Sequence, residues 1–146
     1  MARPRGMTYL MVLWWVAISS VVLAALGQQW AMEARRQRDL ELAFRGNQIR
    51  QALTDYYNQA PEGQPKLLPS RLEDLLLDPR QAKVVRHLRQ LWPDPITGQA
   101  WGLIREGPYI KGVYSTAQRK PVRAPEGVES YEQWRFEFGQ AAERIR

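Results

Sequence analysis

The feature that most constrains this chain is an uncharged apolar run near its beginning, residues 7–27, whose small polar side chains are Thr8, Ser19 and Ser20. A helix needs about 20 consecutive apolar residues to cross the roughly 30 Å hydrocarbon core of a bilayer. A chain of 146 residues has no interior long enough to bury such a helix on all sides. The run therefore predicts a transmembrane helix.

The composition of the chain excludes several classes of function. There is no cysteine, which excludes thiolate metal sites, thiol nucleophiles and disulfides. The formal net charge is +6, and a basic balance of this size is compatible with nucleic acid or with anionic lipid. Because no arginine-rich helix and no groove of alternating basic and aromatic residues stands out, we expect no nucleic-acid partner.

Three interpretations of the apolar run are open. The first is a cleaved secretory signal ending in the small residues at 25–27, although the run is longer than the roughly 7–15 residues typical of such signals. The second is an uncleaved anchor, whose orientation the charges do not settle because arginines precede and follow the run. The third is a segment that keeps its apolar helix after a short leader is cut off between Gly6 and Met7.

The sequence after the apolar run predicts that the helix continues. Residues 28–59 contain no proline and a single glycine, Gly46, and are rich in helix-forming residues. Apolar side chains recur in this stretch at steps of seven, four and three, flanked by two others: Leu42, Ile49, Leu53 and Tyr56, with Leu40 and Phe44. This spacing is typical of an amphipathic helix. We expect one helix of about 50 residues, roughly 80 Å long, which the prolines and glycine at 61–65 end.

The rest of the chain predicts a small head of mixed structure. Ser70 is the expected N-cap of a short helix, with Glu73 as its capping-box partner. Residues 81–91 are expected to form a second short helix with Val84, Val85, Leu88 and Leu91 pointing inward. Strands are expected at 100–105, 109–115 and 134–138, as a small antiparallel sheet packed on the amphipathic half of the long helix. Residues 116–130 are expected to form a loop, and Trp92 and Trp101 to belong to the core.

Few side chains in this head indicate chemistry. His87 is the only histidine, and we expect it to be a surface or partly packed residue. No serine lies in the sequence context of a nucleophile, and no pair of carboxylates has an identifiable catalytic neighbour, so we expect no enzyme. Asp74, Asp78 and Asp94 are candidates to meet around a loop and hold Ca²⁺, which takes about six to eight oxygen ligands. Since no oxygen-rich cluster surrounds Asp94, the expected cofactor is none, with calcium as the one candidate.

The beginning of the chain resembles the type IV pilin-like proteins, in particular the pseudopilins of type II secretion systems. The resemblance rests on the short leader with Arg3 and Arg5, on Gly6 before the expected cut, and on the sequence MTYL that opens the apolar helix. The resemblance implies that a prepilin peptidase cuts after Gly6 and methylates Met7. It also implies that the side chains of the apolar helix pack in the membrane and in the filament: Thr8, Leu10, Met11, Leu13, Trp14, Trp15, Val16, Ile18, Val21 and Leu23.

One position departs from the family's pattern. The family usually carries a glutamate at the fifth mature position, which is Met11 here. A carboxylate in lipid is costly unless it is paired, and in the family it pairs with the amino terminus of a neighbouring subunit. Some minor pseudopilins at a filament tip also lack this glutamate, so the departure points to a minor or tip position. An anchor that never polymerises would show the same departure.

The resemblance implies an α+β pilin-like fold with a leader at 1–6, a transmembrane helix at 7–27, an amphipathic helix at 28–60 and a globular head at 61–146. The turn at 94–98 is similar to a calcium-binding region of major pseudopilins. The implied function is that of a structural subunit of a type II secretion or type IV pilus-type filament. Its implied partners are other pseudopilins or pilins, the prepilin peptidase, an inner-membrane assembly platform and membrane lipid.

The implied location is the inner membrane, crossed once, with the head in the periplasm and a periplasmic filament after assembly. Two other functions are compatible with the sequence. One is a single-span protein, anchored in the inner membrane, that binds an envelope partner without polymerising. The other is an exported enzyme whose signal ends at Gly27, against which the lack of a recognisable catalytic constellation counts.

Overall fold

A computed structural model describes residues 5–140 of the chain. Its first element is one continuous helix of 54 residues, α1 (Arg5–Asn58), which confirms the long helix predicted from the sequence. Residues 1–4 of the expected leader, Arg3 among them, and residues 141–146 of the expected head lie outside the described residues. The chain divides into two compact units, Met1–Arg36 and Gln37–Arg146. The boundary falls inside α1, and each unit is described by itself below.

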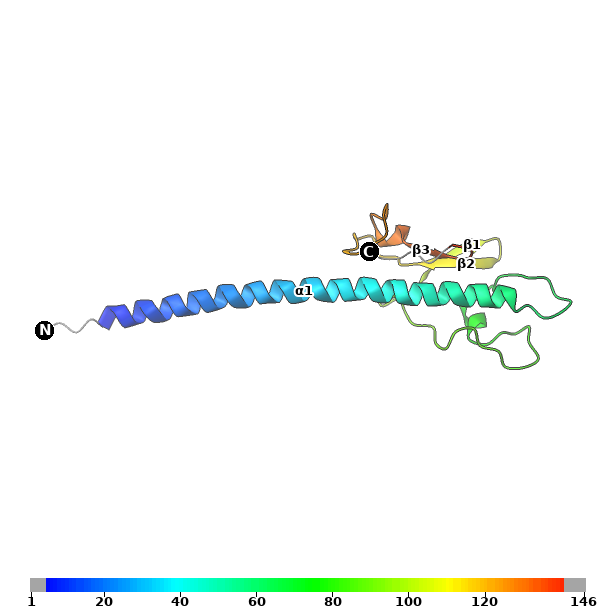
Figure 1. Cartoon of the computed structure of the whole chain (residues 1–146), viewed down its shortest axis with the longest axis horizontal. Helices are drawn as coiled ribbons and strands as arrows, with labels where there is room; N and C mark the ends of the chain where they lie inside the picture. The colour runs from blue at the N-terminus through cyan, green and yellow to red at the C-terminus, as the bar shows by residue number, and fades with distance from the viewer. Residues whose placement is uncertain (1–4, 141–146) are drawn as a thin grey trace. The chain divides into compact units, whose positions relative to one another are not determined.

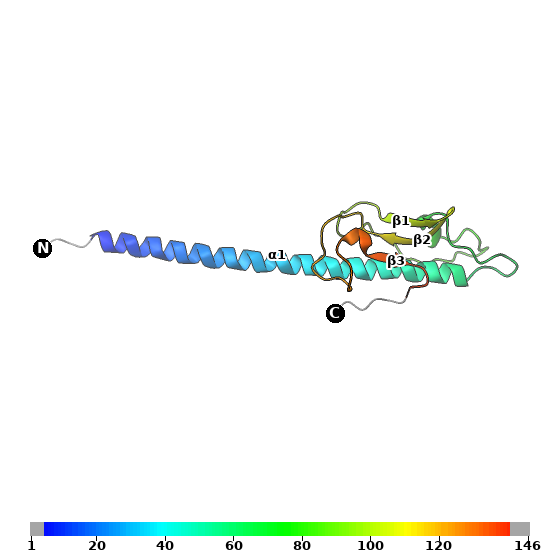
Figure 2. The same cartoon turned by 90° about the horizontal axis from the view of Figure 1, so that it is seen from above.

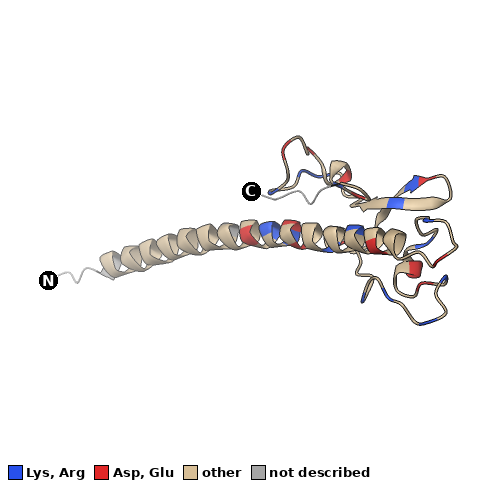
Figure 3. Cartoon of the chain, turned by 45° about the vertical axis from the view of Figure 1, so that its right-hand side comes forward, with Lys and Arg blue, Asp and Glu red and all other residues tan. Residues whose placement is uncertain are grey.

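The first unit consists of the N-terminal part of α1. Every side chain that the structure describes between residues 7 and 36 is exposed. No charged residue occurs between Arg5 and Glu33, and this part of the helix is tan in Figure 3. The hydroxyls of Ser19 and Ser20 donate hydrogen bonds to carbonyl oxygens one turn earlier, at 2.7 and 2.8 Å, which removes their need for water. By length and composition, α1 is able to span a membrane.

In the second unit, α1 buries a stripe of side chains that recur at steps of three and four. The stripe contains the four residues predicted from the sequence together with Asp39 and Gly46. Gly46 is needed here because the ring of Phe136 lies so close that an added Cβ would come within 2.4 to 2.6 Å of it. The flanking Leu40 and Phe44 are exposed, Phe44 to 63 %. The amphipathic half predicted from the sequence is therefore confirmed, with a narrower buried face.

The head contains a three-stranded antiparallel sheet in the order β1-β2-β3. Its strands are β1 (Gly102–Glu106), β2 (Tyr109–Tyr114) and β3 (Arg135–Glu137). All three strands and their antiparallel pairing agree with the prediction, and the α+β fold class is confirmed. The sheet lies on one side of the C-terminal half of α1 (Figure 1). The segment that follows α1 reaches the sheet at Pro69, whose carbonyl accepts a hydrogen bond from the N–H of Ile110 at 2.8 Å. The strands run roughly along the helix (Figure 2).

The core lies between this sheet, the helix and the loops. Its buried apolar side chains come from α1, from residues 72–88 and from the sheet region: Leu42, Ala43, Ile49, Ala52, Leu53, Tyr56, Leu72, Leu75, Leu88, Trp101, Ile110, Val113, Tyr131, Trp134 and Phe136. Trp101 is buried as predicted, whereas Trp92 is 45 % exposed, so its assignment to the core was wrong. Residues 116–130 form no helix or strand, which confirms the predicted loop.

The second short helix, predicted at 81–91, is not present. The backbone of this segment pairs with the preceding turn instead: the carbonyl of Leu75 accepts hydrogen bonds from the N–H groups of His87 and Leu88, both at 2.9 Å. Because these bonds run between segments, they cannot be the local bonds of a helix. Leu88 is buried, but Val84 is 73 % exposed rather than inward.

The short helix before that segment exists as a single 3-10 turn, Leu72–Leu75 (η1). Its predicted cap was wrong by one residue. Asp74, and not Glu73, accepts the hydrogen bond from the N–H of Arg71, at 3.1 Å. A second 3-10 turn, Tyr131–Gln133 (η2), precedes β3.

Candidate functional site

The residues predicted for processing and membrane packing all lie in the first unit. Gly6 and Met7 belong to the first turn of α1, where the leading N–H groups of a helix lack intrahelical partners and the helix frays most easily. The side chains predicted for packing are exposed: Thr8, Leu10, Met11, Leu13, Trp14, Trp15, Val16, Ile18, Val21 and Leu23. Nothing in the described chain covers them, so their apolar surface is available to lipid or to other helices.

The three aspartates predicted as calcium candidates have separate partners. Asp74 holds the turn η1, Asp78 is paired with Arg80, and Asp94 is hydrogen-bonded to Ser115. Among the described residues, no group of three or more histidine, cysteine, aspartate or glutamate side chains is placed to hold a metal ion. The structure therefore does not bring these carboxylates together into one site.

Asp78 is the centre of a buried polar cluster. The Nε of Arg80 donates to its Oδ1 at 2.9 Å and the Nη2 to its Oδ2 at 2.8 Å. The Nε2 of His87 lies 3.1 Å from the same Oδ2, and the His87 side chain is only 1 % exposed. Burial alone would raise the pKa of Asp78, but the hydrogen bonds from Arg80 and His87 outweigh it and lower the pKa to about 2. His87 is therefore a packed residue with a structural partner.

The same cluster closes the C-terminal end of α1. The Nη2 of Arg80 also donates to the carbonyl of Tyr56 at 2.6 Å, and its guanidinium lies 3.5 Å from the centroid of the Tyr56 ring. Gln81 donates through its side-chain amide to the carbonyl of Gln59 at 2.8 Å. The last carbonyls of a helix lack intrahelical partners and attract positive charge. Arg80 supplies both a donor and a charge, so it fixes the segment that follows it to the helix end.

Asp94 fastens a turn to the sheet. Its Oδ2 accepts hydrogen bonds from the hydroxyls of Ser115, at 2.6 Å, and Thr97, at 2.8 Å. Its Oδ1 accepts from the N–H of Ile96 at 2.9 Å, and the turn closes with a bond from the N–H of Gly98 to the carbonyl of Asp94 at 2.7 Å. The predicted turn at 94–98 is confirmed, and its carboxylate is occupied by donors from the chain itself.

Asp39 is a buried carboxylate that sequence reasoning missed. It is fully buried, and its Oδ2 accepts hydrogen bonds from the N–H groups of Val122 and Arg123, both at 2.8 Å. Its Oδ1 accepts a hydrogen bond from the hydroxyl of Tyr131. The signal was its position three residues before Leu42, on the stripe that faces the core. Asp39 ties the loop 116–130 to α1.

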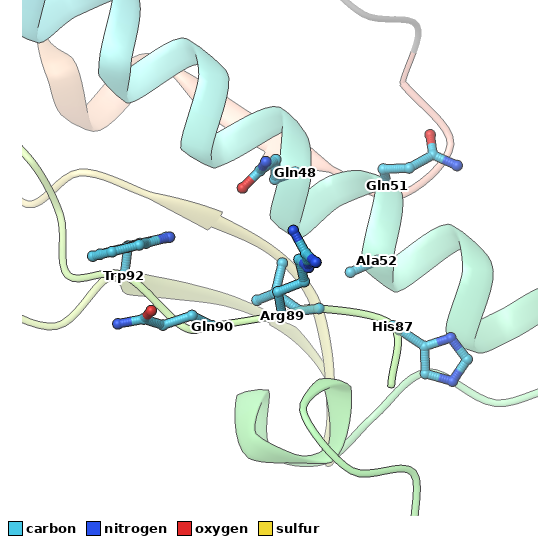
Figure 4. A pocket seen from close by; sticks show the side chains of 8 residues that line it. Gln48, Gln51, Ala52, His87, Arg89, Gln90 and Trp92 are labelled. Carbon is cyan, nitrogen blue, oxygen red and sulfur yellow. The ribbon is translucent and has the colours of Figure 1, made fainter. Parts of the chain in front are cut away.

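A groove of about 590 Å³ lies between α1 and the irregular segment 87–92. It is lined by Gln48, Gln51, Ala52, His87, Leu88, Arg89, Gln90 and Trp92, and Figure 4 shows Arg89 extending from the segment toward the helix near Gln48. At one end of the groove, the guanidinium of Arg45 joins α1 to the segment. It donates a hydrogen bond to the carbonyl of Pro93 at 2.9 Å and lies 5.2 Å from the Trp92 ring centroid. This groove was not predicted, since the segment was expected to be helical.

Comparison with known proteins returned no relative. No protein-family model matches the chain, and neither a curated protein nor a solved structure matches it.

Proposed function

We propose that this chain is a pseudopilin-like structural subunit of a type II secretion or type IV pilus-type filament. The observation that carries the proposal is the continuity of α1 from Arg5 to Asn58. One helix joins an exposed apolar half to a half that packs on an antiparallel sheet. A secretory signal has no need to share a helix with the domain that it exports, whereas a filament subunit uses that helix after processing.

In this function the apolar half of α1 has two environments in succession. Before assembly it crosses the inner membrane once, with the head in the periplasm, and lipid covers its side chains. During assembly the helices of neighbouring pseudopilins or pilins replace the lipid, and the heads form the outer surface of the filament. The prepilin peptidase, which removes residues 1–6, and the inner-membrane assembly platform are the other partners. The role is mechanical, and the energy comes from elsewhere in the machine.

Met11 supports a minor or tip position for this subunit. In the first unit, no acidic side chain precedes Glu33 among residues 5–36, so α1 offers no carboxylate within the apolar run to the amino terminus of a neighbour. A subunit with no neighbour above it does not need that pairing. The competing function is a single-span anchored protein that binds an envelope partner and never polymerises.

The experiment that tests the proposal is the intact mass of the membrane-extracted protein, measured in cells with and without a prepilin peptidase. Loss of residues 1–6 with a methyl group on Met7, only where the peptidase is present, supports the filament subunit. An uncut chain in both cells overturns the proposal in favour of a simple anchor. A chain that begins at Gln28 overturns it in favour of a disposable signal.

Two glycines of α1 provide a test variant and a matched control variant for this experiment. A bulky residue just before the cut should block processing, so Gly6→Leu should stay uncut in cells with the peptidase. Gly27→Leu makes the same change at the end of the apolar run, where an added Cβ meets no atom within 4 Å, and should be processed normally. The reverse result would place the cleavage after Gly27.

A further inference from the structure

The segment between Asp78 and Asp94 is basic throughout. It contains Arg80, Lys83, Arg86 and Arg89 and no acidic residue. Arg80 is committed to Asp78, whereas the other three side chains are exposed and form no ion pair with any described residue. The charge of this segment is therefore available to a negatively charged partner.

The groove beside this segment has a lining that suits a polypeptide. No acidic residue lines it, Arg89 supplies a cation, and Ala52 and Leu88 supply a buried apolar floor. The amides of Gln48 and Gln90 carry both a donor and an acceptor, which match the two polar groups of a peptide unit. Gln51 is hydrogen-bonded to Asp55 at 3.0 Å, whereas neither of the other two amides has a hydrogen-bond partner among residues 5–140. The volume is within the range of about 300–1,000 Å³ found for binding clefts.

The backbone along the groove is also open. The N–H and C=O groups of residues 89–91 make no hydrogen bond with the rest of the described chain. An extended peptide that lies beside such a stretch gains main-chain hydrogen bonds, as in strand addition at a sheet edge. The two ends of the stretch are fixed, at His87 by Asp78 and at Trp92 by Arg45, so little ordering is required on binding.

We propose that this groove binds an extended acidic segment of a partner protein. The backbone of the segment pairs with residues 89–91 and with Gln48 and Gln90, and its carboxylates meet Arg89 and the neighbouring Lys83 and Arg86. The phosphate oxygens of a lipid or a nucleic acid only accept hydrogen bonds, so they would pair with the cations and the N–H donors and leave the carbonyls without a donor. A peptide unit pairs with both the N–H and the C=O groups, which is why a polypeptide fits better. The inference does not depend on cleavage at Gly6, because every residue in it belongs to the head or to the C-terminal half of α1.

The test uses the full chain in neutral detergent micelles and a dye-labelled peptide that alternates glutamate with threonine, followed by fluorescence anisotropy. The glutamate peptide should bind, and an equally long lysine–threonine peptide should not. A hydrogen bond to a charged group contributes enough that Arg89→Glu should weaken binding at least about tenfold. Gln48→Ala removes a neutral hydrogen bond and should weaken binding roughly threefold to tenfold.

The matched control is Lys120→Glu, which makes a reversal of charge in the exposed loop 116–130, outside the groove lining. It should leave the affinity for the glutamate peptide within about twofold, since an exposed charge outside the groove makes no contact with the ligand and is screened by salt. Equal losses from Arg89→Glu and Lys120→Glu would overturn the proposal. So would a DNA oligonucleotide, or vesicles of phosphatidylglycerol, that displace the peptide while Gln48→Ala has no effect, because binding would then follow charge alone. Circular dichroism of each variant checks that the head is folded.

Discussion

Residues 7–27 and residues 39–56 of α1 are both rich in apolar side chains, but only in the second range does the described chain bury some of them. Leu23 is 69 % exposed and Leu53 is fully buried, although they are the same residue type in the same helix. The second set is held by the sheet, by the loops and by a buried carboxylate. The cover for the first set has to come from outside the described chain. Substitutions in the two halves should therefore differ in what they damage.

The largest expected difference comes from truncating a leucine in each half. Leu53→Ala should lower the free energy of unfolding of the head by about 3–4 kcal/mol, because it leaves a cavity in the core. Leu23→Ala should leave that free energy unchanged, since the Leu23 side chain contributes nothing to the head. Urea unfolding of the full chain in detergent, followed by near-ultraviolet circular dichroism, measures both. An equal loss from Leu23→Ala would break the comparison.

Removal of one acidic side chain of α1 in each unit should give the next largest difference in the free energy of unfolding. Asp39→Ala removes a fully buried carboxylate that accepts three hydrogen bonds, from the N–H groups of Val122 and Arg123 and from the hydroxyl of Tyr131, and should cost about 3 kcal/mol. Glu33→Ala removes only an exposed ion pair with Arg36, at 3.8 Å, and such pairs contribute at most about 1 kcal/mol. The same urea experiment compares them. A loss for Asp39→Ala no larger than that for Glu33→Ala would show that the carboxylate does not hold the loop 116–130.

Acid should weaken the head and leave the helix of the first unit intact. The pKa of Asp78 is about 2 in the folded chain, against an ordinary value of 3.8, so its contribution is complete above the ordinary value and is lost as the pH falls toward 2. The shift corresponds to about 2 kcal/mol. Unfolding curves measured at about pH 5 and at about pH 2 should show this loss. Asp78→Asn should be less stable at the higher pH and should show a smaller loss on acidification, and an unchanged pH dependence in this variant would contradict the assignment.

The smallest difference should come from the two glycines of α1 that follow Met7. Gly46→Ala forces the ring of Phe136 to move and should cost about 1–2 kcal/mol, because the overpacking exceeds the gain in helix propensity. At Gly27 an added Cβ meets no atom within 4 Å, so Gly27→Ala should cost nothing and should favour the helix by up to about 1 kcal/mol. Thermal unfolding of the head and the helix signal in detergent report the two effects separately. A stabilised head in Gly46→Ala would mean that the sheet does not rest on this glycine.

The parts of the fold that sequence reasoning predicted correctly are those with a strong repeat. The helix follows from a long stretch without proline, and the first two strands follow from the turn residues before them, at Gly98 and at Gly107. The prediction of a helix at 81–91 was wrong, because apolar residues at helical spacing also occur in an irregular segment that buries one side. Its backbone bonds run to Leu75, and a local pattern contains no information about such partners.

The candidate sites were less predictable than the fold. Asp39 was not predicted from the sequence, because its partners lie 83 to 92 residues further along the chain. The groove forms only where α1 and the segment 87–92 come together in the fold. It could therefore not be predicted from the sequence of either stretch alone. For the apolar half of α1, the sequence predicts a helix able to span a membrane, and α1 has the length and composition for it. The assembly role of its side chains stays a prediction.

The contacts of Asp39 also set an order of events during folding. Its acceptor oxygens are made early in synthesis, but Val122, Arg123 and Tyr131 follow only when most of the chain has been made. Closing contacts over such long separations is slow, because a large loop must be ordered first. A chain cut short before Val122 would therefore keep its carboxylate in water and its core open to proteases. Burial of Asp39, and with it the packing of the loop 116–130 on α1, is therefore complete only after Tyr131 has been synthesised.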